Sequence, residues 1–345
     1  MIFPAPVVGW LRVFILAVGC IVLSFAPVRG EEPLGCRKAE GYLIQNYREQ
    51  YVPKDFPCPS RWWEYADVAA LALLLGTGTW LLLSRRPSRW VGVHLACALL
   101  YFGIFRGGCI CPVGTTANVS LALVHPELIG RATLALFLLP LLAALLCGRI
   151  FCGAVCPLGA VQQITAARSA EPLPERLHRK LLGIPVLVLA LTALMSVWKL
   201  GFLPCLLDPY KPFFFAGHAL VQKAIALAGS GFSEPGIVLA GSLTAWAVFA
   251  GVVILGRWIP RPFCRYICPF GVLLGLVSRV AFYRRRIDPD ACAACARCET
   301  TCPVQAISVD RTRKPALLSL SSYQCVQCGR CSDGCKFQAS TVAPG

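Results

Sequence analysis

Eight cysteines near the C-terminus form two copies of one spacing, C-x2-C-x2-C-x3-C. The first copy comprises Cys292, Cys295, Cys298 and Cys302, and the second comprises Cys325, Cys328, Cys331 and Cys335. Pro303 follows the first copy, and Lys336 takes the corresponding place after the second. Iron in iron–sulfur clusters takes soft thiolate ligands, and such short loops let three thiolates converge on one cluster. The spacing therefore predicts iron–sulfur chemistry.

The doubled spacing is typical of the two-cluster bacterial ferredoxin motif, in which each fourth cysteine ligates the other cluster. It predicts one [4Fe–4S] cluster on Cys292, Cys295, Cys298 and Cys335. It predicts a second on Cys325, Cys328, Cys331 and Cys302. Paired zinc sites and a disulfide scaffold are the alternatives. Zinc prefers two separated C-x2-C pairs, and neither alternative explains a doubled C-x3-C step.

A second motif, C-x3-C-P-x-G, occurs twice upstream of these cysteines. One copy spans 152–159 and the other 264–271, and each continues into an apolar, helix-like stretch. Glycine and proline after the second cysteine suit a tight turn that approaches a cofactor closely. The two copies together supply four thiolates, enough for a third [4Fe–4S] cluster: Cys152, Cys156, Cys264 and Cys268.

A related but weaker motif occurs in two other connections. Cys109 and Cys111 precede a P-x-G element, and Cys205 is followed by Asp208 and then a proline. Their alternation with the C-x3-C-P-x-G copies resembles an inverted repeat, which commonly places sites where its halves meet. We hypothesise a fourth metal centre on these residues at the external face. The alternatives are thiol or disulfide chemistry, or simple packing.

The composition indicates a membrane protein. The chain has 345 residues, of which 57% are hydrophobic and 14% charged, and its mean hydropathy is +0.64. Six apolar stretches approach the ~20 residues that span a bilayer: 8–27, 66–83, 90–105, 132–147, 181–199 and 236–256. We predict a multi-pass all-α membrane domain of about five or six helices and a small α+β ferredoxin domain.

The net charge of +16 is explained by topology rather than by nucleic-acid binding. Basic residues gather after the second, fourth and sixth stretches, among them Arg149, Arg261, Arg265 and the run at 284–286. By the positive-inside rule these ends lie in the cytoplasm, which places the ferredoxin domain there, at a bacterial inner membrane. The basic excess is thus interpreted mainly as topology and lipid contact. We also expect the arginines near Cys264 and Cys268 to stabilise the reduced, more negative state of a cluster there.

Three regions follow from these patterns: a signal or anchor segment with an external loop at 1–65, a transmembrane core at 66–283, and a ferredoxin domain at 284–345. The first apolar stretch fits either a cleaved signal peptide or an anchor helix. Cys36 and Cys58 then lie outside, where an oxidising environment favours a disulfide between them.

With both cysteine motifs considered together, the chain resembles the membrane-bound polyferredoxins of the NapH/NosR type. The resemblance covers the region from the fourth apolar stretch to the C-terminus. It implies that the C-x3-C-P cysteines and the eight ferredoxin cysteines bind clusters. It also implies electron transfer from the quinol pool or a cytoplasmic donor toward a periplasmic enzyme. The large external flavin-binding domain of NosR-like members is not evident, which leaves the terminal partner open.

The sequence therefore predicts a membrane iron–sulfur electron-transfer protein that works within a larger complex. It would pass electrons between a cytoplasmic or quinol donor and a membrane or periplasmic partner. The alternatives are a quinol dehydrogenase subunit with its own quinone site, an electron-supplying maturation factor for a metalloenzyme, and a membrane thiol–disulfide relay.

Overall fold

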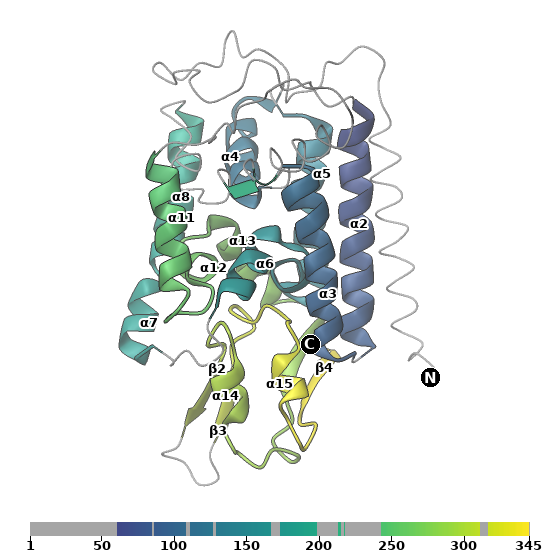
Figure 1. Ribbon diagram of the computed structural model, residues 1–345, viewed down its shortest axis with the longest axis vertical. Helices are drawn as coiled ribbons and strands as arrows, with labels where there is room; N and C mark the ends of the chain where they lie inside the picture. Colours follow the sequence, from purple (N-terminus) through teal and green to yellow (C-terminus); the bar gives the residue numbers. More distant parts are fainter. Residues whose placement is uncertain are drawn as a thin grey trace, which may run out of the picture.

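The computed structural model describes residues 61–84, 86–107, 111–126, 129–166, 173–198, 213–214, 217, 243–310 and 317–344. Within these residues, helices form an elongated body, and the C-terminal residues form a smaller unit, the tail, at one end of it (Figure 1). The predicted first span at 8–27 and the predicted Cys36–Cys58 disulfide lie outside the described residues.

The body is built from helices that are apolar on most of their surface. The longer elements are α2 (Arg61–Leu83), α3 (Ser88–Ala98), α4 (Pro112–Ala122), α5 (Arg131–Cys147), α8 (Ile184–Val197) and α11 (Leu243–Leu255). The shorter ones are α6 (Pro157–Thr165), α7 (Glu175–Leu181), α12 (Pro262–Tyr266), α13 (Pro269–Ser278) and the π-helical turns η2 (Leu99–Phe105) and η4 (Phe151–Val155).

Three helical segments in the described part of the chain are long and apolar enough to cross a membrane. They are Trp62–Leu83, Ser88–Phe105 and Glu175–Val197. Each contains or largely overlaps one of the predicted spans. Shorter apolar helices occur at Arg131–Cys147, Trp246–Leu255 and Pro269–Ser278. The body is thus mostly helical, with three candidate membrane spans.

Apolar side chains on these spans point outward as well as inward. Leu73 on α2, Val93 on α3 and Leu187 on α8 are 68%, 54% and 59% exposed. Contiguous apolar surface of this kind is unusual on a soluble monomer but expected where a helix contacts lipid.

A buried ion pair joins the start of α2 to the end of η2. The Nε and Nη2 atoms of Arg106 donate to the two carboxylate oxygens of Asp67 at 2.9 and 2.6 Å. The hydroxyl of Tyr101 donates to the same carboxylate at 3.3 Å. The pair is bidentate and therefore fixes the two helices in a defined orientation.

The tail is a small α+β unit. Strand β1 (Tyr283–Ile287) pairs antiparallel with β4 (Ser340–Pro344), and β2 (Ile307–Asp310) pairs antiparallel with β3 (Leu317–Leu320). Two short helices carry cysteines between the strands: α14 (Arg297–Thr301) and α15 (Arg330–Asp333). Only residues 279–282 separate α13 from β1, so the tail is held close to the body.

Candidate metal centres

Each C-P-x-G motif begins a helix. Cys111, Cys156 and Cys268 are the N-cap residues of α4, α6 and α13, and a proline occupies the first turn of each. Proline is favoured there because its fixed φ suits the helix and its missing N–H would have no helical partner. At α4 the N–H of Gly114 donates to the sulfur of Cys111 at 3.3 Å. The motif thus places a thiol at the positive end of a helix, where backbone N–H groups are free to donate to sulfur.

The structure brings the four cysteines of the C-x3-C-P-x-G copies together. Each of Cys152, Cys156, Cys264 and Cys268 interacts electrostatically with the other three. Cys152, Cys156 and Cys268 are buried, and Cys264 is half-buried. We refer to this group as the four-cysteine site. The pairing of motifs more than a hundred residues apart is therefore a feature of the fold.

The four-cysteine site has the donors that a [4Fe–4S] cluster needs, because four soft thiols lie near one another and each cysteine of such a cluster binds a different iron. Among the described residues, no group of three or more His, Cys, Asp or Glu side chains is placed to hold a single metal ion.

Close backbone approach shapes the site. A Cβ on Gly159 would lie 2.7 Å from the carbonyl oxygen of Cys152. Glycine is therefore needed at position 159 because α6 begins close to the backbone of Cys152, and a larger residue would not fit there.

Gln162 on α6 joins the two motif copies. Its Nε2 donates to the sulfur of Cys264 at 2.9 Å, and its Oε1 accepts from the backbone N–H groups of Phe263 and Cys264 at 3.0 and 3.3 Å. Hydrogen bonds to ligand sulfurs are one of the means by which a protein sets cluster potentials.

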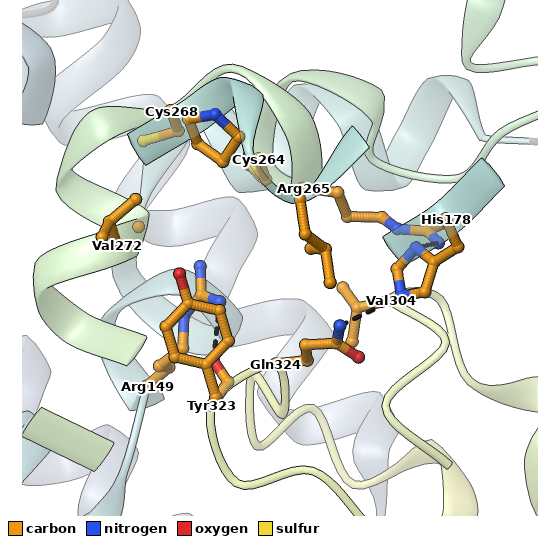
Figure 2. Close-up of a pocket in the computed structure, with 12 residues that line it drawn as sticks. Arg149, His178, Cys264, Arg265, Cys268, Val272, Val304, Tyr323 and Gln324 are labelled. Atoms are coloured by element: carbon orange, nitrogen blue, oxygen red, sulfur yellow. Dashed lines mark hydrogen bonds between the residues drawn. The ribbon is translucent and has the colours of Figure 1, made fainter. Parts of the chain in front are cut away.

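Two buried arginines lie beside the four-cysteine site. The Nη2 atom of Arg149 is 3.9 Å from the sulfur of Cys152, and its charge also acts on Cys264 and Cys268. The Nη1 atom of Arg261 donates to the carbonyl of Cys152 at 3.0 Å, and its charge acts on Cys264. Figure 2 shows Arg149 next to the tail residue Tyr323, to which a hydrogen bond joins it.

The tail cysteines also approach one another across the two copies. Cys302 of the first copy interacts electrostatically with Cys328 and Cys331, and Cys325 interacts with Cys302 and Cys331. Burial raises the pKa of Cys302 to about 11 and that of Cys325 to about 12. These thiols therefore keep their protons at neutral pH unless a metal displaces them.

The rest of the first copy lies nearer the surface. Cys298 interacts electrostatically with Cys292, its partner in the predicted set, and also with Cys331. Cys295 is exposed, and Cys292, Cys298 and Cys335 are half-buried. The predicted first cluster set is thus the more solvent-exposed of the two.

The tail loop that carries Cys325 and Cys328 packs directly on the four-cysteine site. Gly153, between Cys152 and Cys156, is so close that a Cβ there would lie 1.9 Å from the carbonyl oxygen of Val326. The Nη1 atom of Arg149 donates to the carbonyl of Tyr323 at 3.1 Å. The hydroxyl of Ser278 donates to the carbonyl of Ser322 at 2.7 Å. Two predicted cluster sites are therefore in direct contact, and a backbone carbonyl of the tail loop takes part in each of these three contacts.

The predicted external centre is only partly within the described residues. Cys111 begins α4 and is half-buried. Cys109, Cys205 and Asp208 lie outside the described residues. The fourth centre stays a prediction.

The roles of Arg149 and Gln162 were missed from the sequence, whereas the arginines near Cys264 and Cys268 were expected to stabilise a reduced cluster. Arg149 and Arg261 were also interpreted as markers of topology, but both are buried, at 6% and 0% exposure. A signal was present: an arginine stands three residues before the first cysteine of each copy, as Arg149-x-x-Cys152 and Arg261-x-x-Cys264. Gln162 has no counterpart in the second copy, where Leu274 takes its place, so repetition could not have found it.

Both ring nitrogens of His94 on α3 have a hydrogen-bond partner. Its Nδ1 lies 2.8 Å from the carbonyl of Ala154, within the C-x3-C turn, and its Nε2 lies 2.8 Å from the hydroxyl of Thr77. The ring thus ties α2 and α3 to the four-cysteine site.

Family models of known domains match the regions that hold these cysteines. A model described as a 4Fe-4S binding domain matches residues 130–185 and 239–289, which contain the four-cysteine site. A second model with the same description matches residues 286–307, which contain the first tail copy. No solved structure shows significant similarity to the chain.

The chain is also similar to three curated proteins. The chain is 24% identical to the putative electron transport protein YccM of Escherichia coli K12, over 65% of this chain and 59% of that protein. It is 27% identical to the protein NirI of Paracoccus denitrificans, over 75% of this chain and 39% of NirI. It is 30% identical to the regulatory protein NosR of Stutzerimonas stutzeri, over 48% of this chain and 21% of NosR.

The chain thus spans less than two thirds of the length of each of these three relatives. The relatives and the two domain matches confirm the resemblance drawn from the cysteine motifs. The chain thus contains two regions that match 4Fe-4S binding domains, and it is similar to a putative electron transport protein and to the regulatory protein NosR.

Proposed function

We propose that this chain is a membrane electron-transfer protein that passes electrons between a cytoplasmic or quinol donor and a membrane or periplasmic redox partner. Its tail would hold two [4Fe–4S] clusters and its four-cysteine site a third. Bound clusters would supply one-electron transfer without bond-making at a substrate. The observation that carries the proposal is the packing of Val326 and Cys328 on Gly153, which sets one tail cluster site against the four-cysteine site.

The residues of this chain would do three things for such transfer. The cysteines bind, and the helix starts at Cys156 and Cys268 orient two of them. Burial of the four-cysteine site excludes water from its sulfurs. The contacts of Arg149 and Ser278 with the tail keep the two sites at a fixed separation.

The tail would lie in the cytoplasm, beneath about five or six spans. Support comes from the turn between α2 and α3 and the first turn of α3, which carry Arg86 and Arg89 and lie against the tail. The backbone N–H of Ser88, the first residue of α3, donates to a carboxylate oxygen of Asp333 in the tail at 2.7 Å. Basic turns favour the cytoplasmic face, and the tail lies at the same end of the body (Figure 1).

We expect about twelve irons and a similar number of acid-labile sulfides per chain, because each [4Fe–4S] cluster holds four of each. The measurement is iron and sulfide analysis of full-length protein purified anaerobically in detergent. A value of about eight would leave the four-cysteine site without a cluster and would contradict the proposed relay. A value of about sixteen would support a further centre at the external cysteines.

A further inference from the structure

The buried charges of the described residues are unbalanced. One buried carboxylate, that of Asp67, is paired with Arg106. Four arginines are buried as well: Arg149, Arg261, Arg265 and Arg285. Among the ion pairs between described residues, none joins any of these four to a carboxylate.

A buried guanidinium without a counter-charge is costly, because it loses the hydration that stabilises its charge. Arg149 and Arg261 each have a buried Nε atom with no hydrogen-bond partner. Arg261 is also held in the left-handed backbone region, with φ of 54°. Such strain in a residue other than glycine commonly marks a functional position. The two side chains therefore have no carboxylate partner among the described residues, and a negatively charged group bound beside them would supply the missing counter-charge.

Each of the four arginines acts on a cysteine that we predict to be a cluster ligand. Arg149 and Arg261 face the four-cysteine site. Arg265 interacts electrostatically with Cys302, and Arg285 with Cys325. The buried arginines thus lie close to predicted ligands of the two adjacent cluster sites.

We propose that Arg149 and Arg261 are the counter-charges of a cluster at the four-cysteine site, and that they set its reduction potential. The inference rests on the proposed function. An oxidised [4Fe–4S] core with four thiolates carries about two net negative charges, which the two guanidinium groups balance. Gain of one electron adds a further negative charge beside them. The arginines stabilise that reduced form and thereby raise the potential.

Arg149 has a second role in this arrangement. One of its terminal nitrogens is directed at Cys152, and the other donates to the carbonyl of Tyr323, two residues before Cys325. The same side chain therefore balances the charge of the four-cysteine site and holds the tail loop against it. Arg261 contacts Cys152 and Gln163, both in the body, so its replacement tests the charge apart from the tail contact that Arg149 makes.

The test is an EPR-monitored potentiometric titration of full-length protein carrying Arg261→Gln, Arg261→Lys, Arg149→Gln or Arg149→Lys. Loss of the signal in Cys264→Ser identifies the centre. We expect both glutamine variants to shift its potential to more negative values, and both lysine variants to remain near wild type, because lysine keeps the charge. Arg286→Gln, an exposed tail substitution on β1, is the control and should leave the potential unchanged.

Iron analysis of the same variants shows whether each of them still assembles the cluster at the four-cysteine site. If the glutamine variants lose the centre and the lysine variants keep it, the requirement for charge is supported. If lysine and glutamine variants lose it equally, or if all keep it at the wild-type potential, the inference is wrong. A wild-type protein with only about eight irons would instead overturn the proposed function itself.

Discussion

Cys264→Ser is expected to remove about four irons per chain while leaving the tail clusters in place. Cys264 interacts with the other three cysteines of the four-cysteine site and accepts a hydrogen bond from Gln162. A serine hydroxyl is a harder and less acidic ligand than a thiol, so it does not replace the thiolate on iron. Iron and sulfide analysis, together with EPR of the reduced protein, measures the effect.

The matched control is Cys97→Ser. Cys97 is exposed on α3 and belongs to none of the predicted ligand sets, so its replacement should leave the iron content unchanged. An unchanged iron content in Cys264→Ser would exclude a cluster at the four-cysteine site. Loss of all iron would show that the body and the tail do not assemble their clusters separately.

Gly153→Ala is expected to push the tail loop away from the four-cysteine site. The new Cβ would lie 1.9 Å from the carbonyl oxygen of Val326 and 3.5 Å from the backbone nitrogen of Cys328. Backbone atoms cannot rotate away as a flexible side chain can, so the two loops must separate. Overpacking of this kind costs about 1–3 kcal/mol of stability. Iron content should stay near wild type, and electron transfer between the tail and the four-cysteine site should slow.

Freeze-quench EPR after mixing with a limiting amount of reductant measures that transfer. Gly76→Ala on α2 is the control, because a Cβ there meets nothing within 4 Å and alanine favours a helix. If electron transfer in Gly153→Ala is as fast as in wild type and the iron content is unchanged, the loop contact is not the route that electrons take.

Most of what could be predicted came from the spacing of residues that are close together in the sequence. The predicted ligand sets rest on the spacing of cysteines in short loops, and the C-P-x-G element places a proline at the start of a helix, as at α6 and α13. The long apolar stretches correspond to α2, to α3 with η2, and to α8. Each of these signals is contained within about 20 residues of sequence, so the fold does not need to be known.

The features that could not be predicted depend on contacts between segments that are far apart in the sequence. Gly153 is an ordinary glycine in the sequence, and only the fold places it on Val326. The burial of Arg149 and Arg261 could not be predicted for a related reason. A basic residue next to a membrane helix normally marks the cytoplasmic face, and nothing local separates the exposed Arg286 from the buried Arg285 beside it.

The most direct test of electron transfer between the tail and the body is the EPR spectrum of the fully reduced full-length protein. We expect the signal of the centre at the four-cysteine site to show magnetic interaction with the cluster held by Cys325 and Cys328, because their loops are in contact. The interaction should disappear in Cys264→Ser. A spectrum that is the simple sum of independent clusters, identical apart from intensity in Cys264→Ser, would contradict a relay through this interface.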